Sequence, residues 1–358
     1  MADDSEEQHP RDSDALLGHG AAEGHLLRWW NSGRMPHALL ISGPRGIGKA
    51  TLAYRLARFV LSQGVTSDAA VNSLYVAPHD PVFHRVSHKS HAGLLAFERT
   101  YDDKAKRLRS EIVVGEIRKI RPFFGTTTGE GGWRVAIVDA VDEVNVNGAN
   151  ALLKQLEEPP PKGLLIMVAH TPGRLLPTIR SRCQNLTLRS LSQEVMLTIL
   201  AERLNDYTDE ERLALSVLAD GSAGRALALA AQGGLDLYRE LVGLLGSLPE
   251  LDVEGIQGLG DRVSRRGQEA TYRTLIGLLL DWLSRMVRAG AEGRRPVQIL
   301  DSERIMIDRL WQSGKPDAWL DAWERTRDLI FRAEAVNLDK KQVVLNVFTT
   351  LSQVASTR

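Results

Sequence analysis

Gly43–Thr51 reads GPRGIGKAT, a glycine-rich stretch with a lysine directly after its third glycine. A short apolar run, Ala38–Ile41, precedes this stretch, and a helical pattern follows it. Glycines let a backbone turn with its N–H groups facing inward, and a lysine at the head of a helix reaches the outer phosphates of a nucleotide. This order predicts a phosphate-binding loop. The alternative is a glycine-rich turn with an incidental lysine.

The loop and two downstream positions form the predicted site for ATP or ADP. The candidate nucleotide-binding residues are Gly43, Pro44, Arg45, Gly46, Ile47, Gly48, Lys49, Ala50, Thr51, Asp139 and Thr171. The position after the lysine normally carries a hydroxyl that binds Mg²⁺, and here it is Ala50. Thr51 lies about 100° further round the helix. We therefore expect Mg²⁺ binding to be weak or absent.

An acidic candidate follows a second apolar strand, Val135–Val138. An acid at the carboxyl end of such a strand holds Mg²⁺ in P-loop ATPases, and Asp139 has this position. The next residue is usually the glutamate that orients the attacking water, but here it is Ala140. Asp142 and Glu143 follow in a turn, although the register counted from the strand favours Asp139. We therefore expect a site that binds nucleotide but cleaves it slowly or not at all.

A third apolar strand, Leu164–Ala169, ends at a His-Thr pair, where a polar side chain such as that of Thr171 could sense a γ-phosphate. The stretch Gly64–Thr100 lacks clear periodicity and contains four histidines. They are His79, His84, His88 and His91. Their spacing matches no ligand pattern and no cysteine assists, so a polar surface loop is favoured over a metal site. We expect no zinc, and metal binding by the histidines stays an alternative.

Composition narrows the classes of function. The formal net charge is zero, so no global field attracts the chain to nucleic acid. The single cysteine, Cys183, excludes an internal disulfide framework. No apolar run is long enough to span a bilayer, so we expect a cytoplasmic protein without a membrane partner. The carboxylates lack the paired placement of two-metal chemistry, so no polymerase active site is expected.

Strands that alternate with helices predict an α/β domain with a mostly parallel sheet. Asn147 is the expected N-cap of a helix over Ala149–Glu158. From Leu191 onward the pattern is helical, with a linker expected within Pro249–Gly260. The predicted segments are a disordered acidic tail over 1–14, a nucleotide-binding domain over 15–190, a small helical domain over 191–250 and an all-helical domain over 251–358. The last is either a packing module for other subunits or a self-contained bundle.

Several strings together resemble one family. They are MPHA from Met35, GPRGIGKAT from Gly43, NALLKQLEEPP from Asn150 and SRC from Ser181. They are similar to the clamp-loader branch of the AAA+ ATPases, with specific motifs from Asp14 to about Leu235. Within that branch, the delta-prime group of bacterial DNA polymerase III loaders resembles this chain most.

The resemblance implies an AAA+ P-loop domain, a helical lid and a helical collar for oligomerisation. It implies a hetero-oligomer with gamma/tau and delta subunits that acts on a sliding clamp and primer-template DNA. In the family, the Arg of Ser-Arg-Cys, here Arg182, is an arginine finger delivered to a neighbour's γ-phosphate, while delta-prime subunits often do not hydrolyse ATP themselves. The alternative for Arg182 is a surface arginine paired with a carboxylate.

Three questions stay open at this point. Arg225 lies one residue later than the family's sensor arginine, so its role is not assigned. An ATP-hydrolysing subunit of the gamma/tau type is an alternative to the delta-prime type. An AAA+ scaffold unrelated to replication is the other alternative.

Overall fold

A computed structural model of the chain describes residues 9–63, 71–102, 107–109, 111–125, 132–313 and 315–356. The chain divides into two compact units. Unit 1 comprises Met1–Met196 and Gly221–Gly224, and unit 2 comprises Leu197–Asp220 and Arg225–Arg358. The finer domain boundaries at residues 190 and 250 stay predictions.

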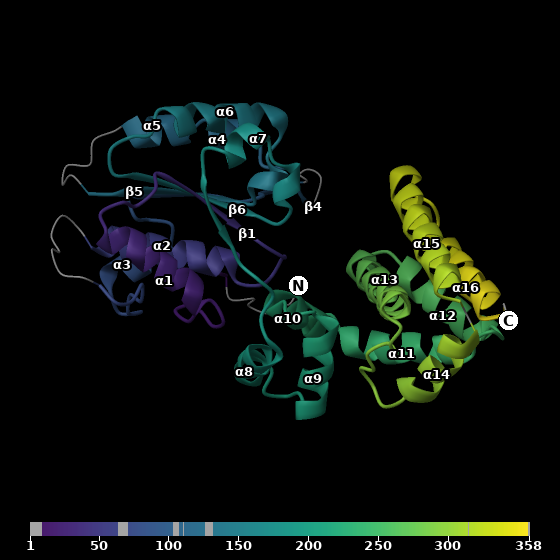
Figure 1. The fold of residues 1–358 in the computed structure, drawn as a ribbon. Coiled ribbons are helices and arrows are strands. Elements are labelled where there is room, and N and C mark those ends of the chain that lie inside the picture. The colour runs from purple at the N-terminus through teal and green to yellow at the C-terminus, as the bar shows by residue number, and fades with distance from the viewer. Residues whose placement is uncertain are drawn as a thin grey trace. The chain divides into compact units, whose positions relative to one another are not determined.

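A parallel five-stranded sheet forms the centre of unit 1, in the order β2-β5-β6-β1-β7 (Figure 1). The strands are β1 (Ala38–Ser42), β2 (Leu94–Phe97), β5 (Arg134–Asp139), β6 (Gly163–Ala169) and β7 (Gln184–Thr187). A short antiparallel pair, β3 (Tyr101–Asp102) and β4 (Arg107–Leu108), lies outside this sheet. The α/β fold with a parallel sheet is confirmed, although β2 lies in a stretch where no periodicity was evident.

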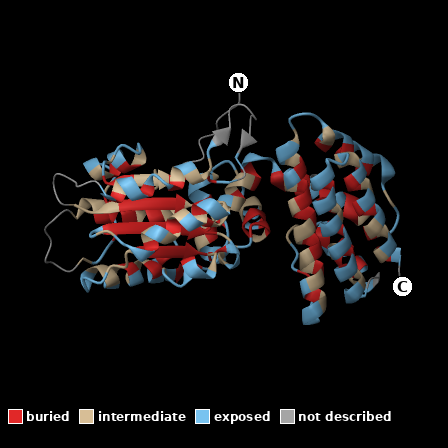
Figure 2. Cartoon of the chain, turned by 90° about the horizontal axis from the view of Figure 1, so that it is seen from above, coloured by how far each residue is buried: buried red, intermediate tan, exposed pale blue. Residues whose placement is uncertain are grey.

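Helices cover both faces of the sheet, with α1 to α3 on one face and α4 to α7 on the other (Figure 1). Their bounds are α1 (Gly20–Asn31), α2 (Lys49–Ser62), α3 (Pro81–Ser87), α4 (Val114–Ile117), α5 (Ile120–Gly125), α6 (Val146–Glu157) and α7 (Pro177–Arg180), with the 3-10 turns η1 (Val141–Glu143) and η2 (Pro172–Arg174). Along β1, Leu39 and Ile41 enter one core while Ala38 and Leu40 enter the other. The central strands are buried on both faces, which explains their unbroken apolar sequence (Figure 2).

The N-cap of α6 corrects a prediction. The side chain of Asn145, not Asn147, accepts a hydrogen bond of 2.9 Å from the backbone N–H of Gly148. The helix begins at Val146, so Asn147 already lies within its first turn. Both asparagines are typical cap residues, and the turn after β5 decides which one is placed at the helix start.

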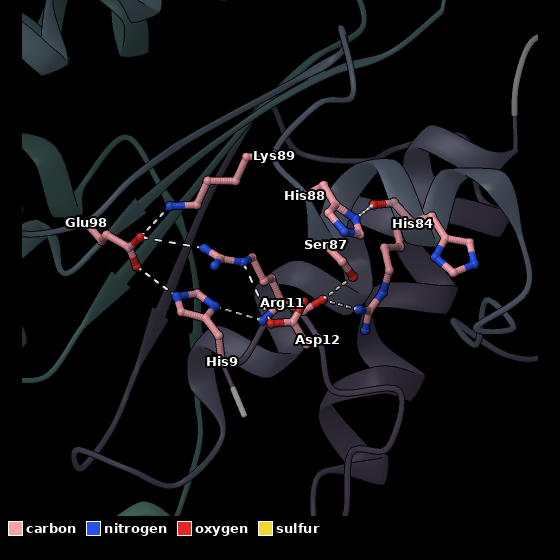
Figure 3. A network of polar contacts seen from close by, with 9 residues as sticks. His9, Arg11, Asp12, His84, Ser87, His88, Lys89 and Glu98 are labelled. Atoms are coloured by element: carbon pink, nitrogen blue, oxygen red, sulfur yellow. Dashed lines mark hydrogen bonds and ion pairs between the residues drawn. The ribbon is translucent and has the colours of Figure 1, made fainter. Parts of the chain in front are cut away.

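The structure also differs from the predicted disordered tail over residues 1–14. Residues 1–8 lie outside the described part, whereas the segment from His9 contacts Glu98 and Arg58 of the same unit (Figure 3). His9 Nε2 lies 2.9 Å from Glu98 Oε2, and Lys89 also bonds this carboxylate. The hydrogen bond from His9, with a further contribution from Lys89, lowers the pKa of Glu98 to about 2. These contacts distinguish His9–Asp14 from a free acidic tail.

Arg58 of α2 holds the segment His9–Asp14 through the backbone of that segment. Its guanidinium is buried and donates hydrogen bonds to the backbone oxygens of Arg11, at 2.8 Å, and Ser13, at 2.6 Å. It also lies over the ring of Phe83, 4.3 Å from the centroid. A buried guanidinium needs such acceptors, and the N-terminal backbone supplies them.

Unit 2 is helical in its described residues. Its helices, wholly or mostly within the unit, are α8 (Gln193–Arg203), α9 (Asp209–Leu218), α10 (Ala223–Ala231), α11 (Gly234–Gly246), α12 (Val253–Ser264), α13 (Glu269–Glu292), α14 (Glu303–Ser313), α15 (Pro316–Val336) and α16 (Lys340–Ser356). Trp282 of α13 and Trp319 of α15 pack edge to face in the core, with ring centroids 5.7 Å apart. The predicted range Pro249–Gly260 contains the end of the connection between α11 and α12, which ends at Asp252 because α12 begins at Val253.

Within the described residues, no single helix has the length and apolar character needed to cross a bilayer. Taken together, α9 and α10 are long and apolar enough to be a candidate span, but the chain bends by 118° at the break between the two helices.

Arg58→Met should release the N-terminal segment. The variant removes two hydrogen bonds from a charged donor, so we expect a loss of about 2–3 kcal/mol in the stability of this contact. Hydrogen exchange should show weaker protection of the amides of residues 11–13. Arg34→Met, at an exposed arginine, is the matched control. Equal protection in wild type and Arg58→Met would contradict this role.

Candidate nucleotide-binding site

The predicted loop connects β1 to α2, as the sequence pattern indicates. Three of its glycines have positive φ: Gly43 at 144°, Gly46 at 76° and Gly48 at 100°. A Cβ on Gly43 would lie 2.4 Å from the carbonyl oxygen of Leu188. Glycine is therefore required at this turn both for its backbone angle and for space.

The carbonyl groups of this loop accept hydrogen bonds from several parts of unit 1. Ser222 Oγ donates to Arg45 O at 2.8 Å, and the N–H of Gly224 donates to Gly46 O at 2.9 Å. Ile47 O lies 2.6 Å from Nε2 of the buried His19. A carbonyl only accepts, so this histidine nitrogen carries the proton. Carbonyls engaged in this way leave the amide N–H groups of the loop to face an anion.

Lys49, the first residue of α2, is 3% exposed. Its Nζ donates to Gly43 O at 2.8 Å and also bonds Pro44 O. Burial lowers the pKa of Lys49 to about 8, although the nearby carboxylates of Asp139 and Asp142 oppose this shift. A desolvated ammonium group held against the loop is suited to bind phosphate oxygens.

Asp139 is the last residue of β5, as predicted, and Ala140 follows it in a buried position. Burial raises the pKa of Asp139 to about 6, and the positive charge of Lys49 limits that rise. The carboxylate is thus ionised at neutral pH. At the adjacent positions, Ala140 provides no base and Ala50 provides no hydroxyl, so the residues fit a nucleotide better than they fit Mg²⁺.

The two acids after Ala140 have other partners. Asp142 accepts hydrogen bonds from the backbone N–H groups of His170, at 3.1 Å, and Thr171, at 2.7 Å. Glu143 lies 3.1 Å from Arg45 and 2.7 Å from Arg99. Asp142 therefore holds the loop after β6, and Glu143 pairs with Arg45 of the phosphate-binding loop. Because both acids have these partners, Asp139 stays the candidate for the acid at the end of the strand.

Thr171 is exposed and lies just beyond the carboxyl end of β6, where the sequence placed it. Sequence analysis did not include its neighbour His170 among the site residues. Within the described residues, Nδ1 of His170 is buried without a hydrogen-bond partner. Burial, together with Lys49 and Arg45, lowers the pKa of His170 to about 4, so the ring is neutral at pH 7.

Arg182 lies apart from these groups. It precedes β7, whose first residue, Gln184, is in register with Leu39 of β1. The loop glycine Gly43 is four residues beyond Leu39, which corresponds to about 13 Å along a strand. In a parallel sheet this places Arg182 at the amino edge and the phosphate-binding loop at the carboxyl edge. Arg182 therefore does not serve its own chain's loop.

Two further groups named from the sequence have other surroundings. Arg225 forms an ion pair with Asp281, and both belong to unit 2. The His84 and His88 side chains lie on or beside α3, and His88 Nδ1 bonds the His84 carbonyl oxygen at 2.8 Å. In the described part of the chain, no group of three or more His, Cys, Asp or Glu residues is arranged to hold a metal ion.

Comparisons with known proteins show which families this chain resembles. The sequence profile of a family described as "DNA polymerase III, delta subunit" matches residues 18–192. Residues 18–192 are therefore similar to subunits of the DNA polymerase III clamp loader. The chain is 33% identical over 202 residues to the DNA polymerase III subunit delta' of Pseudomonas aeruginosa, covering 55% of this chain and 56% of that protein.

Two other relatives come from different groups of the clamp-loader family. The gamma/tau subunit of Mycobacterium tuberculosis is 33% identical over 332 residues, covering 87% of this chain and 52% of that protein. The delta' subunit of Escherichia coli is 29% identical over 208 residues, covering 57% of each. The chain spans about half the length of the curated relatives it matches.

Sequence reasoning missed the residues that support the loop from outside. His19, Ser222 and Gly224 are distant from the loop in sequence. Their hydrogen bonds to the loop depend on tertiary folding, so no local pattern identifies them.

Nucleotide affinity should fall at alkaline pH through Lys49. Phosphate binding favours the protonated amine, whose pKa in the free protein is about 8. Between pH 7 and pH 9 we expect the Kd for Mg²⁺-free ADP to rise about tenfold. Equilibrium titration with a fluorescent ADP analogue measures this. Lys49→Met should bind weakly with little pH dependence, and an equal Kd of wild type at both pH values would contradict the assignment.

Proposed function

We propose that this chain is a delta-prime-type subunit of a DNA polymerase III clamp loader. It binds ATP or ADP at its own loop, cleaves nucleotide slowly or not at all, and donates Arg182 to the nucleotide of a neighbouring subunit. Its partners are gamma/tau and delta subunits, and through them the sliding clamp and primer-template DNA, in the cytoplasm. No zinc takes part.

The position of Arg182 at the amino edge of the sheet carries this proposal. A guanidinium that cannot reach its own phosphate-binding loop, but remains 38% exposed, is available to a nucleotide on another chain. Arginine is permanently charged and binds phosphate oxygens through a planar fork, so it stabilises the charge of a phosphoryl-transfer transition state. The Ser181-Arg182-Cys183 string of this chain, which resembles the clamp-loader motif, supports the same role.

The composition of the chain's own site supports the other half of the proposal. Lys49 and the loop amides suffice to bind phosphates. When bound, Mg²⁺ would neutralise charge between the outer phosphates, and Asp139 is the residue that would hold it. The missing hydroxyl at Ala50 and the missing base at Ala140 each remove a group that normally lowers the barrier by a few kcal/mol.

A gamma/tau-type motor is the second candidate. The match to the gamma/tau subunit of Mycobacterium tuberculosis over 87% of this chain favours it. The intact Lys49 is compatible with it, whereas Ala50 and Ala140 oppose it. Brisk ATP turnover by the isolated chain, abolished in Lys49→Ala, would establish this candidate instead.

Arg182→Ala should reduce ATP hydrolysis by the assembled loader while leaving assembly intact. An arginine finger typically contributes a factor of 10³ or more, so we expect a loss of at least about 10²-fold at the site that Arg182 serves. DNA-stimulated ATPase of the reconstituted complex measures it. Arg180→Ala, at an exposed arginine two residues earlier, should retain normal activity. Unchanged hydrolysis in Arg182→Ala would refute the donation.

Nucleotide binding by the isolated chain should depend little on Mg²⁺. With no hydroxyl at position 50, we expect ATP affinity to change by less than about threefold when Mg²⁺ is chelated. Ala50→Thr restores the ligand and should make affinity depend on the metal. Isothermal titration with and without chelator compares the two proteins. A strong Mg²⁺ requirement in the wild-type chain would show that another group holds the ion.

A further inference from the structure

The turn that carries Arg182 is held by its own side chains. Ser181 Oγ and Arg182 Nη1 both donate to the carbonyl oxygen of Thr178, at 3.2 Å and 3.1 Å. Cys183 Sγ donates to Ile179 O at 3.0 Å, and burial raises the pKa of this thiol to about 12. The cysteine is thus an inert anchor, and the backbone of Arg182 is fixed between two bonded neighbours.

A carboxylate from another element completes this arrangement. Glu157, the last residue of α6, places Oε1 3.1 Å from Arg182 Nη2. The side chains are 53% and 38% exposed, and ion pairs of this kind contribute little to stability. The helix dipole also disfavours a carboxylate at the carboxyl end of a helix. A carboxylate at position 157 therefore does not stabilise α6, but it does contact Arg182.

We infer that Glu157 is a positioning residue for Arg182, an inference that rests on the proposed donation of this arginine. A guanidinium has five N–H groups. Nη1 donates to Thr178 O and Nη2 forms the ion pair with Glu157, so the remaining N–H groups can bind the oxygens of a neighbour's γ-phosphate. With its rotamer held in advance, the side chain loses less conformational freedom when the neighbouring site closes around it.

The carboxylate of Glu157 acts through Arg182 alone, by an ion pair with Nη2 that favours the rotamer in which Nη1 donates to Thr178 O. The amide of a glutamine keeps one oxygen acceptor at this position, so part of the effect should survive in Glu157→Gln.

A double-mutant cycle in the reconstituted loader tests the inference. Glu157→Ala should lower kcat for DNA-stimulated ATP hydrolysis about three- to tenfold with little change in KM. Glu157→Gln should recover at least part of that loss. In the Arg182→Ala background, Glu157→Ala should have almost no further effect. Glu158→Ala removes the adjacent exposed carboxylate and should behave as wild type.

The outcomes separate the two claims. If Glu157→Ala lowers kcat by the same factor with and without Arg182, Glu157 does not act through the arginine, and the inference fails. If Arg182→Ala is inactive while Glu157→Ala equals wild type, the inference fails and the donation stands. If Arg182→Ala hydrolyses ATP normally, the donation fails, and the positioning role fails with it. Size-exclusion chromatography of each complex confirms that assembly is unaffected.

Discussion

The phosphate-binding loop depends on hydrogen bonds that engage its carbonyl groups from distant parts of unit 1. His19, Ser222 and Gly224 come from distant parts of the sequence, and each occupies an acceptor of the loop backbone. With these carbonyls engaged, the loop keeps its amides and Lys49 available to phosphate. The support does not require bound nucleotide, since its donors all belong to unit 1.

The parallel sheet separates the two chemical capabilities of the chain. Its carboxyl edge carries the loop, Asp139 and the segment after β6, while its amino edge carries Arg182 and Glu157. Because strand direction determines which loops share an edge, no rearrangement of side chains alone could bring Arg182 to Lys49. The proposed donation of Arg182 to another chain rests on this separation.

The strands of the sheet and the residues of the phosphate-binding loop were predictable from the sequence. The residues that support the loop and the turn of Arg182 were not, for physical reasons. The apolar runs at β1, β5 and β6 are buried on both faces, so their positions follow from composition alone. The loop glycines and Lys49 were also identifiable, because their backbone angles and charge belong to a local motif. Glu157, His19 and Ser222 were not, since their partners lie far along the chain. Asn145 displaced Asn147 as the cap of α6 because the preceding turn, not cap preference, sets the helix start.

In the proposed assembly, Arg182 acts on a nucleotide bound to a different subunit. The most direct test is a structure of the assembled loader with ADP and a γ-phosphate transition-state mimic bound at the neighbouring site. The account predicts the Arg182 guanidinium within hydrogen-bonding distance, about 3 Å, of the mimic's oxygens, with Glu157 still in contact. An Arg182 side chain far from every bound nucleotide in that assembly would contradict the account.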